Sequence, residues 1–189
     1  HVPQQYFDRY PLEDIVLPTI KTDDLNDIPD EGLRLARAKG DDFEQIQEAN
    51  KWKEAIQAYL ASITFADEQV GIILEALATS AYQDNTIIVL WSDHGWHLGS
   101  KQHWHKQTLW EECTRIPFII KAPGLTQEGQ GCDKPVDMVN VFPTLLSLCR
   151  LPAKEGLDGY DMTPLLKNPQ SEWEYPALTE IKMGNMTVR

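Results

Sequence analysis

Apolar residues recur at steps of three and four between Gln45 and Ser80, which is the spacing of an amphipathic helix. The apolar positions are Ile56, Tyr59, Leu60, Ile63, Val70, Ile73, Leu74 and Leu77. This spacing predicts one or two amphipathic helices. Ahead of them, residues 1–45 place prolines between short polar runs. We expect that part to be an irregular covering segment with at most a turn of helix.

Two short apolar runs follow the helical stretch. Ile87 to Trp91 has the almost unbroken apolar character of an interior strand in a parallel sheet that is covered on both faces. Ile116 to Lys121 predicts a second strand, which ends at Ala-Pro-Gly, and Val136 to Leu148 has the spacing of a helix. The tail, YPALTEIKMGNMTVR, contains two brief strand candidates. A long helix followed by a buried strand predicts an α/β layout, with its core over residues 46–170.

Composition and charge narrow the range of partners. The 189 residues suffice for one domain with a sizeable core. Seventeen Lys and Arg against 29 Asp and Glu give a net charge of -12, so we expect neither nucleic acid nor an anionic membrane as a partner. No apolar run approaches the roughly 20 residues that span a bilayer, and HVPQQYFDRYPLEDI does not read as a signal peptide. Cys113, Cys132 and Cys149 lack CxxC spacing, which indicates neither a disulfide framework nor a zinc-thiolate site.

Four of the five histidines crowd into WSDHGWHLGSKQHWHK, just after the first predicted strand. Ligands of α/β sheets bind beyond the carboxyl ends of the strands. There Asp93 offers a hard oxygen and His94 an imidazole nitrogen, so we expect both to bind one divalent cation. Lys106 supplies a compact ammonium that would neutralise an anion held on that metal. A metal and an ammonium facing one pocket would bind sulfate or phosphate.

Two other interpretations of this stretch stay open. Asp, His and Gly are common turn residues, so Ser92 to Gly95 could be a structural turn. The histidines could instead form a zinc or copper site, because imidazole suits those ions. These histidines are His94, His97, His103 and His105. The alternation around Trp104 would, however, aim neighbouring histidines in different directions.

The stretch from Thr86 to Gly124, TIIVLWSDHGWHLGSKQHWHKQTLWEECTRIPFIIKAPG, resembles the sulfatase family of the alkaline phosphatase superfamily, in the branch similar to iduronate-2-sulfatase. Other pieces match in order. His1-Val2-Pro3 followed by YFDRYPLEDIVLP resembles the PHxPF-type segment of that branch, and VNVFPTLLSLCRLP followed by LDG resembles a later helix and loop. The resemblance covers nearly the whole chain. It implies an alkaline-phosphatase-like sandwich with a central, mostly parallel sheet between helices, here incomplete.

The resemblance also implies roles for particular residues. Asp93 and His94 would be ligands of a divalent cation, usually Ca²⁺ in this family. Lys106 would contact the sulfate and the leaving-group oxygen, and His1 would hydrogen-bond a sulfate oxygen or support the leaving group. Lys106 and His1 are therefore the expected catalytic and substrate-binding residues. The substrate would be a sulfated small molecule or glycan, and the family suggests a periplasmic, secreted or lysosomal location.

The chain departs from the family pattern in two places. The family usually reads L-G-E-H-G after the metal turn, whereas Leu98 to Gln102 reads LGSKQ. Sulfatases also attack sulfur with a formylglycine made in a C/S-x-P/A/S-x-R motif, which no Cys or Ser of this sequence carries. We therefore expect residues 1–189 to be the later part of a sulfatase catalytic domain, with a C-terminal strand region beginning at residues 171–189. The formylglycine and two more acidic ligands would lie in a remaining N-terminal half, so this chain alone should be inactive.

Two alternative functions remain open. A phosphate or phosphonate monoester hydrolase of the same superfamily would use the same metal and lysine, because both bind any tetrahedral anion. A non-catalytic relative would keep the pocket in order to bind sulfated glycans. The nucleophile motif of the missing half would discriminate between them.

Overall fold

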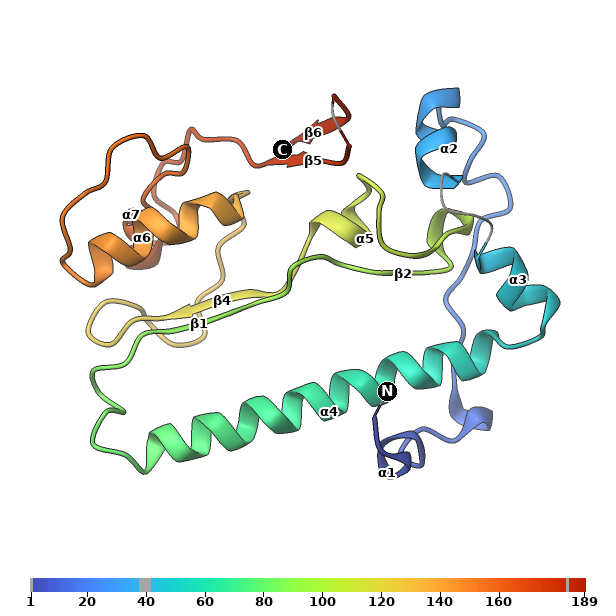
Figure 1. Cartoon of the computed structure of the whole chain (residues 1–189), viewed down its shortest axis with the longest axis horizontal. Coiled ribbons are helices and arrows are strands. Elements are labelled where there is room, and N and C mark those ends of the chain that lie inside the picture. Colours follow the sequence, from blue (N-terminus) through green and yellow to red (C-terminus); the bar gives the residue numbers. More distant parts are fainter. Residues whose placement is uncertain (1, 38–41, 183) are drawn as a thin grey trace. The chain divides into compact units, whose positions relative to one another are not determined.

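The structure is a computed structural model that describes residues 2–37, 42–182 and 184–189 (Figure 1). It contains two compact units. Unit 1 comprises residues 1–83 and 94–108, and unit 2 comprises residues 84–93 and 109–189. One crossing of the chain between the units falls at the peptide bond that joins Asp93 to His94.

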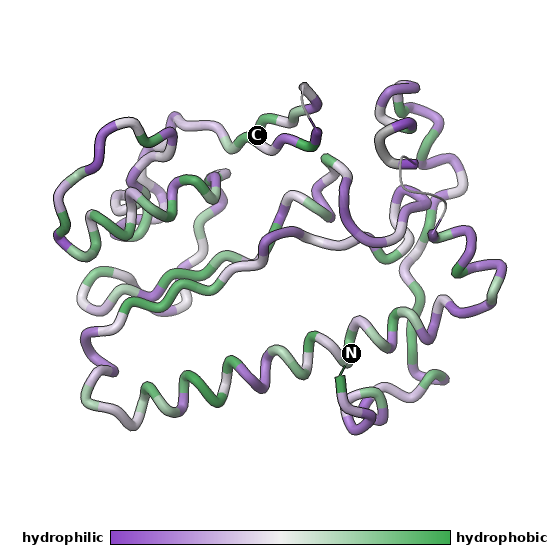
Figure 2. Tube along the Cα trace, in the orientation of Figure 1, coloured by the Kyte–Doolittle hydropathy of each residue, from purple (hydrophilic) through white to green (hydrophobic). Residues whose placement is uncertain are grey.

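Helices make up most of the described part of unit 1. They are α1 (Gln4–Phe7), η1 (Leu12–Asp14), α2 (Asp30–Arg37), α3 (Asp42–Glu48) and α4 (Trp52–Ala78). The predicted amphipathic helices are confirmed as α3 and α4, and Figure 2 shows apolar residues recurring along α4. The first 45 residues contain more helix than the sequence pattern predicted. In α2 the acidic residues lie in the first turn and the arginines in the last, which favours a helix through its dipole.

The segment from α1 to η1 covers one face of α4. Tyr6 is buried, and its ring meets Phe65 edge to face with 5.3 Å between centroids. Its hydroxyl donates to Glu68 at 2.7 Å, and the Gln57 side chain donates to the Tyr10 carbonyl at 2.7 Å. Residues 4–14 are therefore held on the helix by an aromatic contact and by hydrogen bonds that satisfy polar groups at its edge.

A short hairpin completes unit 1. Strands β2 (His97–Leu98) and β3 (Trp104–His105) pair antiparallel, with η2 (Ser100–Gln102) between them. Gly99, at a φ of 124°, makes the turn where a Cβ would lie 2.8 Å from the Trp52 ring. Trp52 Nε1 donates to the Leu98 carbonyl at 3.0 Å. The hairpin is thus fixed on the start of α4.

Unit 2 contains the two principal predicted strands. Strands β1 (Ile88–Trp91) and β4 (Phe118–Lys121) pair antiparallel, with Ile88 opposite Lys121 and Trp91 opposite Phe118. The two strands are confirmed, but the expectation of a covered interior β1 in a parallel sheet is wrong for the described residues. There β4 is the strand that pairs with β1, and Leu90 and Trp91 are 38% and 50% exposed. An apolar run indicates that a strand suits a covered environment, but it does not specify which segment covers it.

The remaining elements of unit 2 are short. They are α5 (Glu111–Thr114), η3 (Met138–Asn140), α6 (Val141–Leu148), α7 (Thr163–Lys167), β5 (Leu178–Glu180) and β6 (Met186–Val188). The predicted helix over Val136 to Leu148 is confirmed as η3 and α6, and the two tail strands are confirmed as the antiparallel pair β5 and β6.

Asn140 and Thr144 fasten the LDG loop to α6. Both side chains are 1% exposed. Asn140 Oδ1 accepts from the Tyr160 amide at 2.9 Å, and Thr144 Oγ1 accepts from the Met162 amide at 2.9 Å. Gly159 packs directly on the backbone of η3, where a Cβ would lie 2.1 Å from the Val139 carbonyl oxygen. The loop therefore needs glycine at this position because of close backbone approach.

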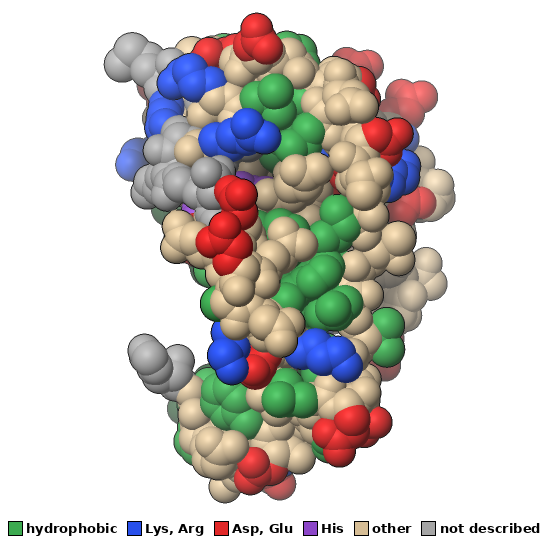
Figure 3. Space-filling view, turned by 90° about the vertical axis from the view of Figure 1, so that its right-hand side faces the viewer, with side chains coloured by type: hydrophobic (Ala, Val, Ile, Leu, Met, Phe, Trp, Pro, Cys, Tyr) green, Lys and Arg blue, Asp and Glu red, His purple; other side chains and the backbone are tan. Residues whose placement is uncertain are grey.

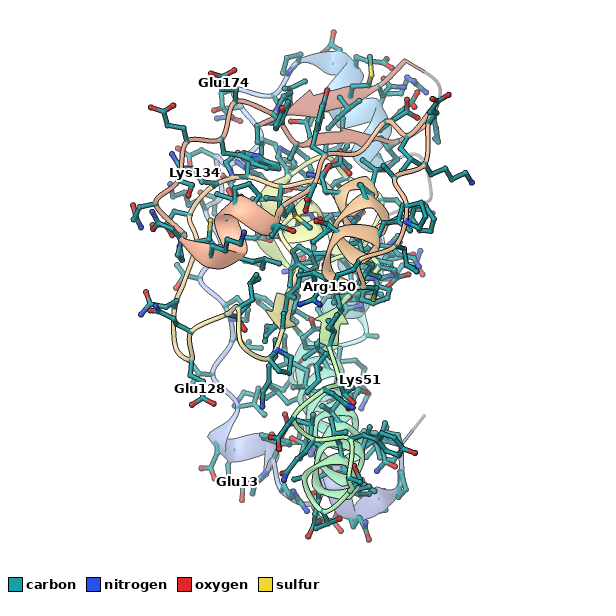
Figure 4. All side chains as sticks on the ribbon, turned by 90° about the vertical axis from the view of Figure 1, so that its left-hand side faces the viewer. Glu13, Lys51, Glu128, Lys134, Arg150 and Glu174 are labelled. Atoms are coloured by element: carbon teal, nitrogen blue, oxygen red, sulfur yellow. The ribbon has the colours of Figure 1, made fainter. Side chains whose placement is uncertain are left out.

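The surface mixes charges with apolar side chains. Acidic and basic groups are interspersed with apolar ones on the face drawn in Figure 3, and Glu13, Glu128 and Glu174 extend away from the ribbon in Figure 4. From Ile63 onward, α4 leaves several apolar residues exposed, namely Ile63, Ile72, Ile73 and Leu74. Among the helices that the structure describes, none combines the length and the apolar character needed to cross a membrane.

Candidate active site

His94 and Lys106 meet within unit 1. Lys106 Nζ lies 2.8 Å from His94 Nε2, and His94 Nδ1 lies 2.8 Å from the Gly95 carbonyl oxygen. An ammonium group can only donate, so Nε2 must carry the lone pair. The proton of the neutral imidazole is then on Nδ1, which donates to the Gly95 carbonyl. These two contacts assign the tautomer of His94 and present Nε2 to a positive charge.

This tautomer suits a metal ligand. A metal-binding histidine usually donates its second ring N–H to a carbonyl or carboxylate, as Nδ1 of His94 does to Gly95. Asp93 directly precedes His94 and its exposed carboxylate is a hard donor. The two residues therefore fit a divalent cation in kind, although two side chains do not complete its shell. Within residues 2–37, 42–182 and 184–189, no three His, Cys, Asp or Glu side chains gather as a metal site.

The backbone on both sides of Lys106 has an unusual conformation. The φ angles of His105 and Gln107 are 63° and 81°, in the left-handed region. Left-handed backbone costs about 1–2 kcal/mol for a residue other than glycine, so it persists where surrounding contacts enforce it. His103 Nε2 donates to the Lys106 carbonyl at 3.0 Å, and His105 Nε2 donates to Asp42 Oδ2 at 2.8 Å. Two histidines therefore hold the turn that carries Lys106.

His97 fastens the hairpin from inside. Its side chain is fully buried, with Nε2 2.7 Å from Thr108 Oγ1 and Nδ1 2.9 Å from Ser100 Oγ. Its ring also meets the His103 ring at right angles, 5.0 Å between centroids. The contacts of His97, His103 and His105 thus build the segment that positions Lys106. The zinc or copper hypothesis is wrong for the described residues, because these histidines form no metal group there.

Residues of the LGSKQ stretch, where the chain departs from the family pattern, make contacts that stabilise the structure. Ser100 hydrogen-bonds His97, and Lys101 Nζ lies 2.7 Å from Asp24 Oδ1. The hydrogen bond from Lys101 holds the pKa of the Asp24 carboxyl below its ordinary value. Residues that differ from the family pattern therefore tie the hairpin to the N-terminal segment.

The structure brings together part of the predicted site. His94 and Lys106 are in contact, as expected. Asp93 belongs to unit 2, where it lines a cavity of about 960 Å³, and its convergence with the other two on one pocket stays a prediction. His1 lies outside the described residues, and its role also stays a prediction. Sequence reasoning missed Asp42, which is remote from His105 in sequence and carries no motif.

His103 should make the stability of the protein depend on pH. Burial lowers its pKa below the ordinary value of 6.5, and the positive charge of His105 lowers it too, whereas the Lys106 carbonyl and Asp42 raise it. Below about pH 6.5 the unfolded chain therefore takes up a proton before the folded chain does. We expect the unfolding free energy to fall with pH from about 6.5 down to the lowered pKa, and to fall less in His103→Gln, which keeps an N–H donor.

Urea unfolding at several pH values between about 7.5 and 5.0 measures this effect. The comparison is between wild type and His103→Gln, because His97, His105 and Asp42 face the same side chain and are present in both proteins. Identical pH profiles for the two proteins would contradict the assignment.

Comparison with known proteins places the chain in a family. The family model described as Sulfatase matches residues 1–151. A Sulfatase of Formosa agariphila is 40% identical over 190 residues, which cover 100% of this chain and 37% of that protein. Iduronate 2-sulfatase of Mus musculus is 29% identical over 188 residues, covering 79% of this chain and 33% of the other. The chain thus spans about a third of the length of these curated relatives.

Solved structures agree with this placement. The phosphonate monoester hydrolase of Silicibacter pomeroyi has a TM-score of 0.82 at 24% identity, with 97% of this chain and 38% of that chain covered. The protein BT4656, in complex with its substrate D-glucosamine-2-N,6-O-disulfate, has a TM-score of 0.66 at 27% identity, with 74% and 30% covered. These likenesses confirm the predicted alkaline-phosphatase-like α/β fold class. With the family model matching most of its residues, the chain belongs to the sulfatase family.

Proposed function

We propose that the protein carrying this chain is a metal-dependent sulfuric ester hydrolase that cleaves sulfate monoesters of a sulfated sugar. The observation that carries the proposal is the pairing of Lys106 with His94, which sets an ammonium 2.8 Å from an imidazole nitrogen held in a metal-binding tautomer. Asp93 precedes this pair in the sequence. Family membership supports sulfate as the anion.

The chemistry requires positive charge at one oxygen. Hydrolysis breaks the S–O bond of R–O–SO₃⁻ and, with one water, yields R–OH and hydrogen sulfate. Negative charge develops on the bridging oxygen as that bond breaks, and the Lys106 ammonium would stabilise it. A divalent cation on Asp93 and His94 would supply Lewis-acid stabilisation of the sulfate oxygens. Nε2 has one lone pair, so it would serve either Lys106 or a metal; with a metal held there, the Lys106 ammonium would be available to the anion.

The nucleophile is proposed to lie outside this chain. Cys113, Cys132 and Cys149 are free thiols, and none stands in the motif from which formylglycine is made. We assign the nucleophile to a formylglycine in a remaining N-terminal half of the catalytic domain. His1 is proposed to hydrogen-bond a sulfate oxygen.

A sugar is the substrate class that the relatives support. BT4656 binds D-glucosamine-2-N,6-O-disulfate, and the mouse relative is named for the sulfate of iduronate. Measuring sulfate release from a panel of isomeric sugar sulfates would determine which sulfate position is cleaved.

Removal of the metal tests the proposal. The protein should release sulfate from 4-methylumbelliferyl sulfate and from glucosamine 6-sulfate. Dialysis against EDTA should lower the rate by about a hundredfold or more, because several kcal/mol of charge stabilisation is lost, and Ca²⁺ should restore it. Ion chromatography of sulfate is the measurement. Unchanged turnover after EDTA treatment would contradict metal dependence.

Esters that differ in the central atom of the anion discriminate between the alternative functions. 4-Methylumbelliferyl phosphate and a phenylphosphonate monoester present the same tetrahedral anion with another central atom. Faster hydrolysis of these than of the sulfate would favour the phosphonate hydrolase reading, whose structural neighbour at 24% identity shows only the fold. Binding of sulfated glucosamine without release of sulfate would favour a non-catalytic relative.

A further inference from the structure

We propose that Asp42 is a positioning residue for Lys106: its hydrogen bond with His105, here named the Asp42–His105 brace, holds the turn that directs the Lys106 ammonium toward His94. The effect on turnover rests on the proposed function. The effect on the position of Lys106 does not.

The turn needs an external hold. His105 and Gln107 flank Lys106 in the left-handed region, with φ values of 63° and 81°. Side chains other than glycine avoid this conformation, so the turn would relax if its contacts were removed. The pairing of His105 with His97 holds the strand side of the turn, and His103 Nε2 holds the Lys106 carbonyl. The His105 side chain provides a further contact that holds the turn.

The Asp42–His105 brace connects the His105 side chain to helix α3. His105 Nε2 donates to Asp42 Oδ2 at 2.8 Å, and the His105 side chain is 19% exposed. Asp42 is the first residue of α3, and its neighbour Phe43 is 3% exposed and packs edge to face on Trp52 at 5.1 Å. Asp42 therefore occupies an anchored position, although its side chain is 42% exposed.

This arrangement separates positioning from stability. A partly exposed hydrogen-bonded pair contributes little to the free energy of unfolding. The same pair sets the direction of a side chain whose misplacement by about 1 Å is enough to lower turnover by about a hundredfold. Removal of Asp42 should therefore move Lys106 while leaving the protein folded.

The first experiment measures Lys106 directly and needs no turnover. Purified protein is treated with trace acetic anhydride, and acetylation of each lysine is quantified by peptide mass spectrometry. In Asp42→Ala, Lys106 should react about threefold or more faster than in wild type, because its ammonium loses the partly buried contact with His94. Lys134, which is exposed in unit 2, is the internal reference and should not change. Equal Lys106 rates in the two proteins would overturn the proposal.

Matched variants guard against a general loss of structure. Glu44→Ala removes a carboxylate from the same helix, two residues away, and should behave as wild type. His105→Ala removes the donor, breaks the brace from its other side and should reproduce Asp42→Ala. Asp42→Asn keeps an acceptor for His105 and should restore most of the wild-type Lys106 rate. A Glu44→Ala effect as large as that of Asp42→Ala would overturn the assignment.

The second experiment follows turnover of a sulfate ester with the same variants. Asp42→Ala should lower kcat about ten- to hundredfold, with the melting temperature near that of wild type. An unchanged kcat would overturn the positioning role in catalysis. If wild type itself releases no sulfate, the proposed function fails, whereas the acetylation rates still decide whether the brace positions Lys106.

Discussion

Replacing Lys106 with alanine is expected to lower kcat for a sulfate ester by about a hundredfold or more, while the melting temperature stays within about 2 °C of wild type. The ammonium makes its strongest interaction when charge builds on the departing oxygen, so its loss weakens the transition state more than the ground state. In the folded protein the same ammonium donates to a neutral His94, a contact that the alanine variant loses at small cost in stability. Steady-state kinetics and thermal unfolding of one preparation measure both quantities.

Lys101→Ala is the matched control for that result. Lys101 lies in the same segment as Lys106, but its ammonium pairs with Asp24. Its removal should leave kcat within about threefold of wild type. A Lys106→Ala enzyme with near-normal kcat would show that Lys106 only solvates the turn, and the catalytic assignment would then be wrong.

Gly159→Ala is expected to lower the unfolding free energy by about 3 kcal/mol or more. A Cβ at this position would lie 2.1 Å from the carbonyl oxygen and 2.5 Å from the carbonyl carbon of Val139. These are backbone atoms of η3, which cannot withdraw without disturbing the hydrogen bonds that Asn140 and Thr144 make to the loop. Urea unfolding, followed by tryptophan fluorescence, measures the change.

Gly131→Ala serves as its control. A Cβ at Gly131 would meet nothing within 4 Å, and the backbone there has an ordinary φ. This variant should unfold within about 0.5 kcal/mol of wild type. If Gly159→Ala shared the wild-type midpoint, the close approach of the LDG loop to η3 would be refuted.

The parts of the fold that the sequence predicts are those with local signals. Helix α4 follows from apolar spacing, and β1 and β4 follow from short apolar runs. Helix α2 was missed because its pattern extends over only eight residues and lies in a proline-punctuated polar segment. The antiparallel pairing of β1 with β4 was also missed, since the partner of a strand depends on distant parts of the chain.

The candidate site divides in the same way. His94 and Lys106 were identified from the chemistry of their side chains and from the resemblance, and the structure places them in contact. The roles of His97, His103 and His105 depended on backbone geometry and burial, which composition does not reveal. Asp42 carried no signal, because acidic residues are common in a chain with 29 of them.

Along the sequence the chain alternates between its two units, and this order matters during synthesis on the ribosome. Strand β1 emerges about thirty residues before β4, its antiparallel partner. At roughly 5–20 residues per second, the apolar side chains of β1 wait about 2–6 s for that partner. Meanwhile residues 94–108, which belong to unit 1, can already close onto the finished helix α4. During that interval the nascent chain presents β1 as an unpaired apolar segment of the kind that chaperones bind.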